Sequence, residues 1–235
     1  MIAGLTFPSG YSWTTAPPPR RPITVSRTEL MQIGVAFAVL TFDFVLILSG
    51  AGLLEGGGFT RAFSSLAIVG VSALTALTAF VAHEMAHKVT AQREGCWAEF
   101  RWSVPGLAFS ILTAYLGFLF AAPGATMVSG MSDVRQWGKT ALAGPALNVS
   151  FGAAFYAGAL VSWYAGSSLF VWLLILAFFN NWFGAFNLLP FGPLDGAKVL
   201  RWNTAVWVVS MLGIGALAAV SYAALFYYGN PVLQV

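Results

Sequence analysis

Long apolar stretches constrain the fold of this chain more than any other feature of its sequence. Four segments reach the roughly 20 residues needed to cross a bilayer, and a fifth follows them: about Leu30–Leu54, Phe63–His87, Gly138–Tyr164, Leu169–Pro190 and Thr204–Tyr228. Charged residues make up only 8% of the chain, against roughly 25% in a typical soluble domain. Because a backbone in lipid must satisfy its own hydrogen bonds, the sequence predicts an all-α polytopic membrane protein with about five transmembrane helices.

A sixth apolar piece, Leu107–Ala122, is short for a span and is bracketed by Pro-Gly pairs that mark turns. The distribution of basic residues indicates whether it crosses. If it does not cross, almost all of them fall on one side of the membrane: Arg20, Arg21, Arg27, Lys88, Arg93, Arg101, Arg135, Lys139, Lys198 and Arg201. Only Arg61 then falls on the opposite side. The positive-inside rule therefore favours five spans with the N-terminus in the cytosol.

The connection between the second and third spans carries a strand-like pattern. Residues Ala98–Val104 alternate between apolar and polar side chains, which is the period of a β-strand. A short stretch bounded by glycine, Ala125–Met131, follows the sixth apolar piece. We expect residues 97–131 to form a small β-hairpin-like insert that dips into the membrane from the cytosolic side or packs within the protein.

The only two histidines of the chain lie in the run His83-Glu84-Met85-Ala86-His87, at the end of the second apolar stretch. Residues i and i+4 share one face of a helix, so both imidazoles can bind a single Zn²⁺ while Glu84 stays free to act as a base. Such a cluster is costly within a membrane-length segment, which indicates a function. The single cysteine, Cys96, argues against a cysteine-based zinc site and excludes an internal disulfide.

A catalytic zinc usually has three protein ligands, and with no histidine left the third is expected to be a carboxylate. Besides Glu84, two of the eight acidic residues lie in or next to apolar spans, namely Asp43 and Asp195. In the five-span topology the second and fourth spans run in the same direction, so Asp195 approaches the histidines on the cytosolic side. This favours Asp195 as the third ligand. Asp43 either pairs with a polar group inside the bundle or lines a path for water or substrate.

Three motifs together resemble the site-2 protease family of intramembrane zinc metalloproteases. The first is H-E-x-x-H, and the second is the family's N-x-x-P-x-x-x-x-D-G, matched at Asn187, Pro190, Asp195 and Gly196. The third is G-P-x-x-N, in the run Gly144-Pro145-Ala146-Leu147-Asn148. The resemblance covers about residues 62–200 and is to a minimal form without a PDZ or CBS domain.

The resemblance implies that His83, His87 and Asp195 bind one zinc ion per chain and that Glu84 is the catalytic acid and base. It also implies that Asn187 helps to hold the polarised carbonyl of the substrate. Asn148 is open to two readings, a hydrogen bond to a neighbouring helix or a role in catalysis. The implied activity is hydrolysis of peptide bonds within or near transmembrane segments of membrane proteins, as in regulated intramembrane proteolysis.

The alternative is a non-proteolytic transporter or binding protein with a structural metal site. The expected partners are a transmembrane protein substrate and the lipid bilayer, and a net charge of +3 is too small to indicate nucleic acid. The oligomeric state stays open. We expect a multi-pass protein of the cell membrane with its active site toward the cytosol. Its expected organisation is a cytosolic segment (1–28), a first helix and loop (29–61), the catalytic core (62–200) and a last helix (201–235).

Overall fold

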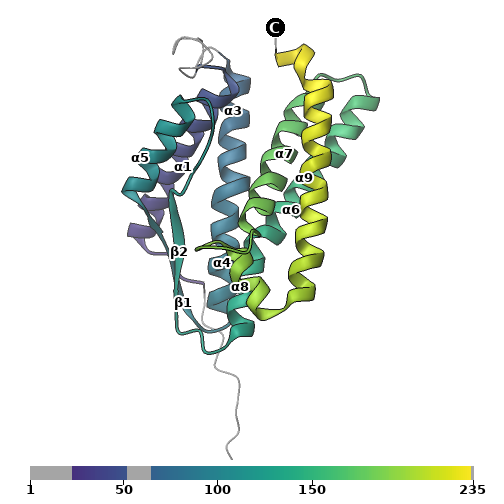
Figure 1. Cartoon of the computed structure of the whole chain (residues 1–235). Helices are drawn as coiled ribbons and strands as arrows, with labels where there is room; N and C mark the ends of the chain where they lie inside the picture. The colour runs from purple at the N-terminus through teal and green to yellow at the C-terminus, as the bar shows by residue number, and fades with distance from the viewer. Residues whose placement is uncertain (1–22, 52–64, 234–235) are drawn as a thin grey trace, which may run out of the picture.

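The computed structural model describes residues 23–51 and 65–233 of the chain (Figure 1). Most of the predicted cytosolic N-terminal segment, and Arg61, lie outside the described residues. The elements follow one another as α1 (Arg27–Leu48), α3 (Leu66–Thr75), the π-helical segment η1 (Ala76–Val81), α4 (Ala82–Arg93), β1 (Trp97–Trp102), α5 (Val104–Tyr115), β2 (Gly124–Ser129), α6 (Val134–Tyr164), α7 (Leu169–Asn187), α8 (Asp195–Trp202) and α9 (Thr204–Leu233).

Among the described residues, five helices are long and apolar enough to cross a membrane. They are Arg27–Leu48, Leu66–Arg93, Val134–Tyr164, Leu169–Asn187 and Thr204–Tyr228. The predicted fold class is therefore confirmed, with shifts of a few residues at the ends of the spans. The first span ends earlier than expected because Gly50 adopts a positive φ of 61° directly after the helix, a conformation that glycine adopts without a steric penalty.

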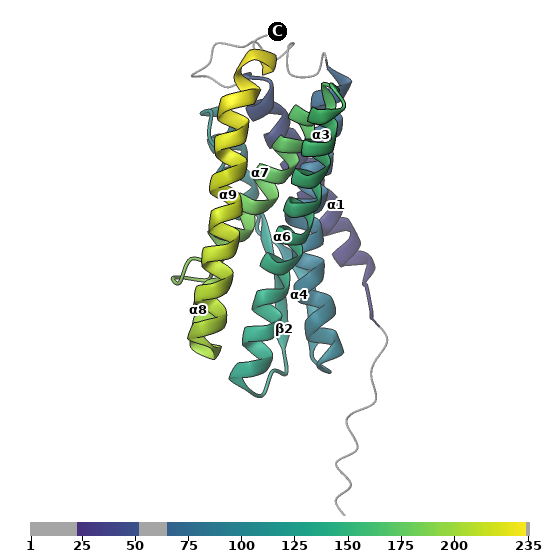
Figure 2. The ribbon, with the colours of Figure 1, turned by 90° about the vertical axis from the view of Figure 1, so that its right-hand side faces the viewer.

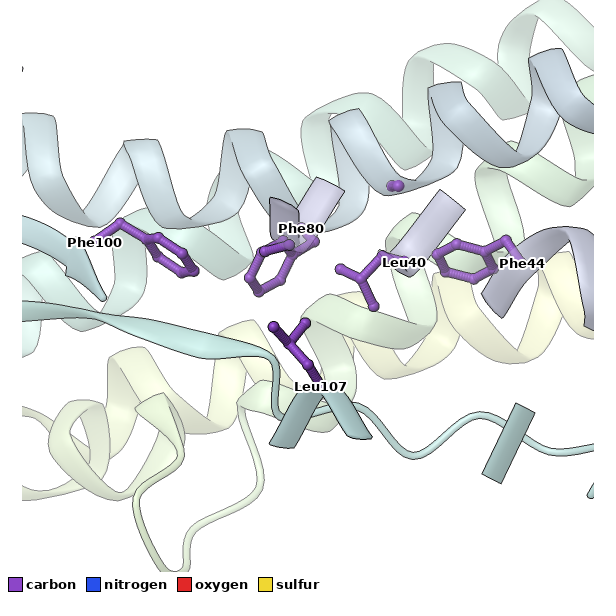
Figure 3. Close-up of a cluster of buried hydrophobic side chains, with 7 residues drawn as sticks. Leu40, Phe44, Phe80, Phe100 and Leu107 are labelled. Carbon is purple, nitrogen blue, oxygen red and sulfur yellow. The ribbon is translucent and has the colours of Figure 1, made fainter. Parts of the chain in front are cut away.

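The predicted insert is a two-stranded sheet whose strands flank a short helix. β1 and β2 pair antiparallel, with Phe100 opposite Thr126, and α5 fills the connection between them. At 12 residues, α5 is too short to span a bilayer. The insert packs against α1 and the long second helix through a buried cluster that contains Leu40, Phe44, Phe80, Phe100 and Leu107 (Figure 3). This packing fixes the sheet next to α4.

Helix α6 contacts α4, α7 and α8. Figure 2 shows α6 with α4 on one side and α8 and α9 on the other. The H-E-x-x-H motif on α4 and Asp195 of the second motif, at the start of α8, therefore both lie against α6. The sheet, the end of α4 and α8 all lie at the same end of the bundle (Figure 1).

A buried ion pair joins three elements at this end. Lys88 Nζ pairs with Glu29 Oε2, and both side chains are almost fully buried. Glu29 Oε1 also accepts a hydrogen bond of 2.9 Å from the backbone N–H of Phe100. The pair therefore connects the first turn of α1 with α4 and β1. Lys88, one of the basic residues that the topology argument counted, is thus a paired core residue rather than an exposed interfacial charge.

Candidate metal centre

Three side-chain atoms from two helices converge beside the first half of α4. His83 and His87 lie one helical turn apart, and their Nε2 atoms are 2.9 Å from each other. Asp195, the first residue of α8, places its Oδ2 atom 3.4 Å from the Nε2 of His83 and 3.0 Å from the Nε2 of His87. All three residues are buried. The structure therefore brings together the two histidines and the carboxylate that the sequence singles out.

The partners of the other ring nitrogens define which atoms face the centre. His83 Nδ1 lies 2.5 Å from Oδ1 of Asn148, and His87 Nδ1 lies 2.7 Å from the backbone carbonyl of Thr140. Carbonyl oxygens only accept hydrogen bonds, so each Nδ1 is the donor, and in its neutral form each ring presents the lone pair of Nε2 toward Asp195. Three atoms that carry lone pairs then face one another, an arrangement that a positive charge between them stabilises.

The distances fit a zinc ion. Ligand atoms about 2.1 Å from a tetrahedral zinc lie about 3.4 Å apart, and the three atoms here are separated by 2.9, 3.0 and 3.4 Å. Two imidazoles and one carboxylate are also one of the ligand sets found in catalytic zinc sites. Of the described residues, His83, Glu84 and His87 form a group whose ligand atoms all lie within 4.8 Å of one another.

The amide of Asn148 is held in one orientation by a buried polar network. Its Nδ2 donates to the backbone carbonyl of Ala79 at 3.0 Å and lies 3.5 Å from Oδ1 of Asn180. Asn180 in turn donates to the hydroxyl of Thr78 at 2.9 Å. Because Nδ2 is used in this way, Oδ1 of Asn148 must face His83. Thr78 and Ala79 belong to η1, and π-helical segments are frequent at functional sites.

Close packing requires glycine at two positions of the motifs, Gly144 and Gly196. A Cβ atom on Gly144 would lie 2.5 Å from Nε2 of His87 and 2.6 Å from Cε1 of His83. A Cβ atom on Gly196 would overlap the carbonyl of Leu188, at the end of α7. The glycines therefore allow α6 to approach the imidazoles and α8 to begin directly against α7, which places Asp195 at the centre.

The second carboxylate oxygen of Asp195 lies 3.2 Å from Nζ of Lys198, one turn further along α8. The ammonium group of Lys198 is a cation beside this carboxylate and favours its ionised form, in which Asp195 can act as a metal ligand.

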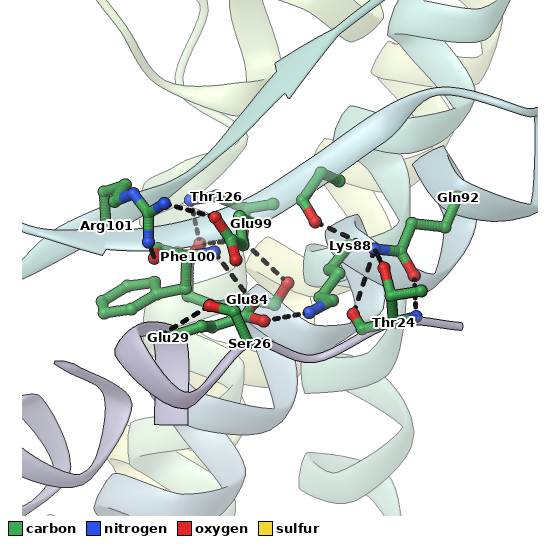
Figure 4. Close-up of polar contacts among 11 residues, drawn as sticks. Thr24, Ser26, Glu29, Glu84, Lys88, Gln92, Glu99, Phe100, Arg101 and Thr126 are labelled. Carbon is green, nitrogen blue, oxygen red and sulfur yellow. Dashed lines mark hydrogen bonds and ion pairs between the residues drawn. The ribbon is translucent and has the colours of Figure 1, made fainter. Parts of the chain in front are cut away.

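Glu84 lies next to the two histidines and is held by the sheet. The backbone N–H of Thr126 donates to Oε2 of Glu84 at 2.7 Å. The hydroxyl of Thr126 lies 2.8 Å from the same oxygen and 3.0 Å from the backbone carbonyl of Glu84 (Figure 4). Strand β2 is thus directly bonded to the residue that the sequence predicts as the base.

A cavity of about 200 Å³ adjoins this cluster. It is lined by His83, Glu84, His87 and Asp195, by the β2 residues from Gly124 to Thr126, and by Asn187. Asn187 donates through Nδ2 to the carbonyl of Phe183 at 3.0 Å. The cavity therefore gathers the predicted ligands, the predicted base and the predicted carbonyl-binding residue around one space.

Asp43 lies away from this cavity, in the packed interface of α1. Its side chain is fully buried. The hydroxyl of Ser110, on α5, interacts with its carboxyl group, although no contact among the described residues has full hydrogen-bond geometry. The expectation that Asp43 pairs with a polar group inside the bundle stays a prediction. Asp43 also does not line the cavity around the histidines.

Sequence reasoning missed several residues of this site. Thr126 lies on a short strand with no motif of its own, and the partner of His87 is a backbone carbonyl, which no side-chain pattern reveals. Asn180 sits within an apolar span, where its polar side chain was the only signal. Asn148 was identified from the sequence, and in the structure it accepts a hydrogen bond from His83 and donates one to the carbonyl of Ala79 on the neighbouring helix.

Two histidines one turn apart and a carboxylate on a later helix, buried among membrane-length helices, define a membrane metalloprotein. Over 150 residues the chain is 37% identical to "Putative zinc metalloprotease MJ0611" of Methanocaldococcus jannaschii, a match covering 63% of this chain and 77% of that relative. The chain belongs to the site-2 protease family of zinc metalloproteases.

A second relative is the protein named "Putative zinc metalloprotease Rip3" of Mycobacterium tuberculosis. It is 32% identical over 191 residues, which cover 77% of this chain and 43% of the relative. The chain therefore spans less than half the length of this mycobacterial protein. No family model and no solved structure matches the chain.

Proposed function

We propose that this protein is an intramembrane zinc endopeptidase that cleaves membrane proteins within or near their transmembrane segments. The observation that carries the proposal is the convergence of His83 Nε2, His87 Nε2 and Asp195 Oδ2 beside Glu84, in a cavity enclosed by apolar helices. Its family and the names of its two relatives support zinc as the metal.

In this proposal, His83, His87 and Asp195 hold the zinc. Zinc in such a site lowers the pKa of water and polarises a carbonyl group. Glu84 takes a proton from the attacking water and passes it to the nitrogen of the leaving amine, so its carboxylate returns to its starting state. Asn148 and the carbonyl of Thr140 hold the two imidazoles in the tautomer that presents Nε2.

Asn187 is proposed to bind the carbonyl oxygen of the scissile bond. It lines the cavity, and only one of its two amide N–H groups is used by the carbonyl of Phe183. The second N–H is available to donate to an oxygen that gains negative charge during the reaction. One such donor typically contributes about 3 kcal/mol to the stabilisation of the transition state.

A substrate helix must unwind before its carbonyls can be attacked, and a sheet edge can bind the unwound segment by strand addition. Side chains of α1 and α4 cover the outer edge of β1 through three hydrogen bonds: Gln92 Nε2 to Ala98 O (2.9 Å), Phe100 N to Glu29 Oε1 (2.9 Å) and Trp102 N to Gln32 Oε1 (3.3 Å). The free edge of β2, where only Thr126 bonds to a side chain, that of Glu84, borders the cavity. We therefore assign substrate pairing to β2 rather than to β1.

The proposed topology places the N-terminus and the active site toward the cytosol. The end of α4, the sheet and α8 lie together at one end of the bundle (Figure 1). Basic residues of these elements, among them Arg93 and Arg201, cluster at that end. An excess of basic residues at one end supports a cytosolic location for it.

Zinc analysis and cleavage in proteoliposomes test the proposal together. Wild-type protein and Glu84→Gln are expected to contain about one zinc per chain, and Asp195→Ala is expected to lose it. Only wild-type protein is expected to cleave a reconstituted transmembrane substrate. Zinc that survives in Asp195→Ala would contradict the ligand assignment. Zinc-loaded wild-type protein that cleaves no transmembrane substrate would favour a structural metal site instead.

A further inference from the structure

The hydrogen bonds from Thr126 occupy Oε2 of Glu84, an oxygen that the proposed function needs as the acceptor of a proton from water. Thr126 presents two donors to Glu84, its backbone N–H at 2.7 Å from Oε2 and its hydroxyl at 2.8 Å from the same oxygen (Figure 4). Hydrogen bonds to an ionised carboxylate are stronger than those between neutral groups. In the free protein, Oε2 of Glu84 is therefore occupied by β2.

The direction of the N–H groups along β2 follows from the pairing with β1. Phe100 and Thr126 are opposite each other, yet the N–H of Phe100 points away to Glu29 and that of Thr126 points away to Glu84. This is a pair without mutual hydrogen bonds, and such pairs alternate with bonded pairs along an antiparallel ladder. The backbone groups of Gly124, Thr126 and Val128 therefore face the free edge.

A peptide added to this edge would bond to those same three residues. The outward groups of Gly124 and Val128 have no side-chain partner among the described residues, whereas the N–H of Thr126 already has Glu84. One N–H makes one strong hydrogen bond, so Glu84 and an added strand compete for Thr126. The competition occurs at the border of the cavity that contains the histidines.

We propose that Thr126 is a positioning residue whose backbone N–H is transferred from Glu84 to the substrate when a strand pairs with β2. This inference rests on the proposed function. In the free protein, Thr126 holds the carboxylate of Glu84. On pairing, a substrate carbonyl accepts the N–H, and Oε2 of Glu84 keeps only the hydroxyl of Thr126 as a partner, which leaves it a lone pair to accept the proton of the attacking water. Docking of the substrate strand thus releases the base only when a peptide is in place.

Substrate affinity gives the first test. Two variants without the catalytic carboxylate, Glu84→Ala and Glu84→Gln, are compared in lipid nanodiscs with a synthetic transmembrane peptide of about 20 residues that carries a central Gly-Gly pair. Glutamine keeps an oxygen that can accept the N–H of Thr126, and alanine does not. We expect the peptide to bind Glu84→Ala about fivefold more tightly, the effect of removing one competing neutral hydrogen bond. Equal affinities, or weaker binding to Glu84→Ala, would overturn the inference.

Hydrogen exchange at single amides gives the second test, independent of activity. In free protein, the Thr126 amide is expected to exchange slowly in wild type and quickly in Glu84→Ala, and the peptide is expected to restore its protection. The amide of Val128, on the same edge without a side-chain partner, serves as the control and is expected to be protected only by the peptide. A Thr126 amide that exchanges equally in both free proteins would show that Glu84 does not hold it.

Kinetics separate positioning from a structural role. Thr126→Val keeps the β-branched shape and the backbone N–H but loses the hydroxyl, and it is expected to lower kcat about tenfold with KM unchanged. Thr126→Ser is expected to restore kcat. If wild type binds zinc and cleaves the substrate, and Thr126→Val has the same kcat as Thr126→Ser, this inference alone fails. If wild type neither binds zinc nor cleaves, the proposed function fails, and the exchange experiment still decides the contact.

Discussion

Replacing Asn148 by alanine removes the hydrogen-bond acceptor of His83 without touching the three proposed ligands. In the structure, His83 Nδ1 lies 2.5 Å from Oδ1 of Asn148, and this contact fixes the tautomer and the orientation of the ring. Without it, the imidazole can rotate or shift its proton to Nε2, the nitrogen that faces Asp195. The expected result is weaker zinc binding with the ligand set intact.

The magnitude follows from two effects. Loss of a group that orients a metal ligand typically lowers metal affinity by 10- to 100-fold, or about 1.4 to 2.7 kcal/mol. Alanine also leaves the carbonyl of Ala79 without the N–H that Asn148 donates at 3.0 Å. An unpaired buried polar group costs about 1–3 kcal/mol. Asn148→Ala is therefore expected to lower both zinc affinity and stability of the protein.

Competition with a fluorescent zinc chelator, in detergent, measures the affinity of each variant. Asn148→Asp keeps an oxygen for His83 and is expected to bind zinc nearly as well as wild type. Ser150→Ala, an exposed position on the same helix whose hydroxyl bonds only to the helix backbone, is the matched control. A zinc affinity of Asn148→Ala within twofold of the control would refute the assigned role of Asn148.

Three further predictions use other features of the bundle. Gly144→Ala is expected to abolish zinc binding, measured as metal content, because the added methyl would overlap the ring nitrogen of a ligand, whereas Gly158→Ala meets only ordinary contact and should keep the metal. Asp43→Leu is expected to raise the thermal midpoint in detergent, since it removes a buried carboxylate that makes no full hydrogen bond among the described residues, a group that costs about 1–3 kcal/mol; an unchanged or lower midpoint would contradict this. Lys88→Met is expected to destabilise the protein by about 3–5 kcal/mol because it leaves the buried carboxylate of Glu29 without its counter-charge. The double variant Glu29→Leu with Lys88→Met should recover most of that loss in the same unfolding assay, and a double variant no more stable than the single one would speak against the pair.

Sequence alone was sufficient for the spans and for the proposed ligands. A backbone in lipid must satisfy its own hydrogen bonds, so the position of each membrane helix follows from local hydropathy. His83 and His87 are related by one helical turn, which is also a local property. Asp195 lies more than 100 residues away, but the chain has so few acidic residues that elimination and the direction of the spans were enough to find it.

Tertiary structure alone decided which groups support those ligands. The contacts of Asn148 with His83, of Thr126 with Glu84 and of Glu29 with Lys88 join residues at least 42 positions apart. Each depends on how neighbouring helices and the sheet pack, and packing is set by many side chains at once rather than by a local pattern. The sequence thus determined the membrane helices and the chemistry of the site, while the packing of distant segments determined the orientation of each reactive group.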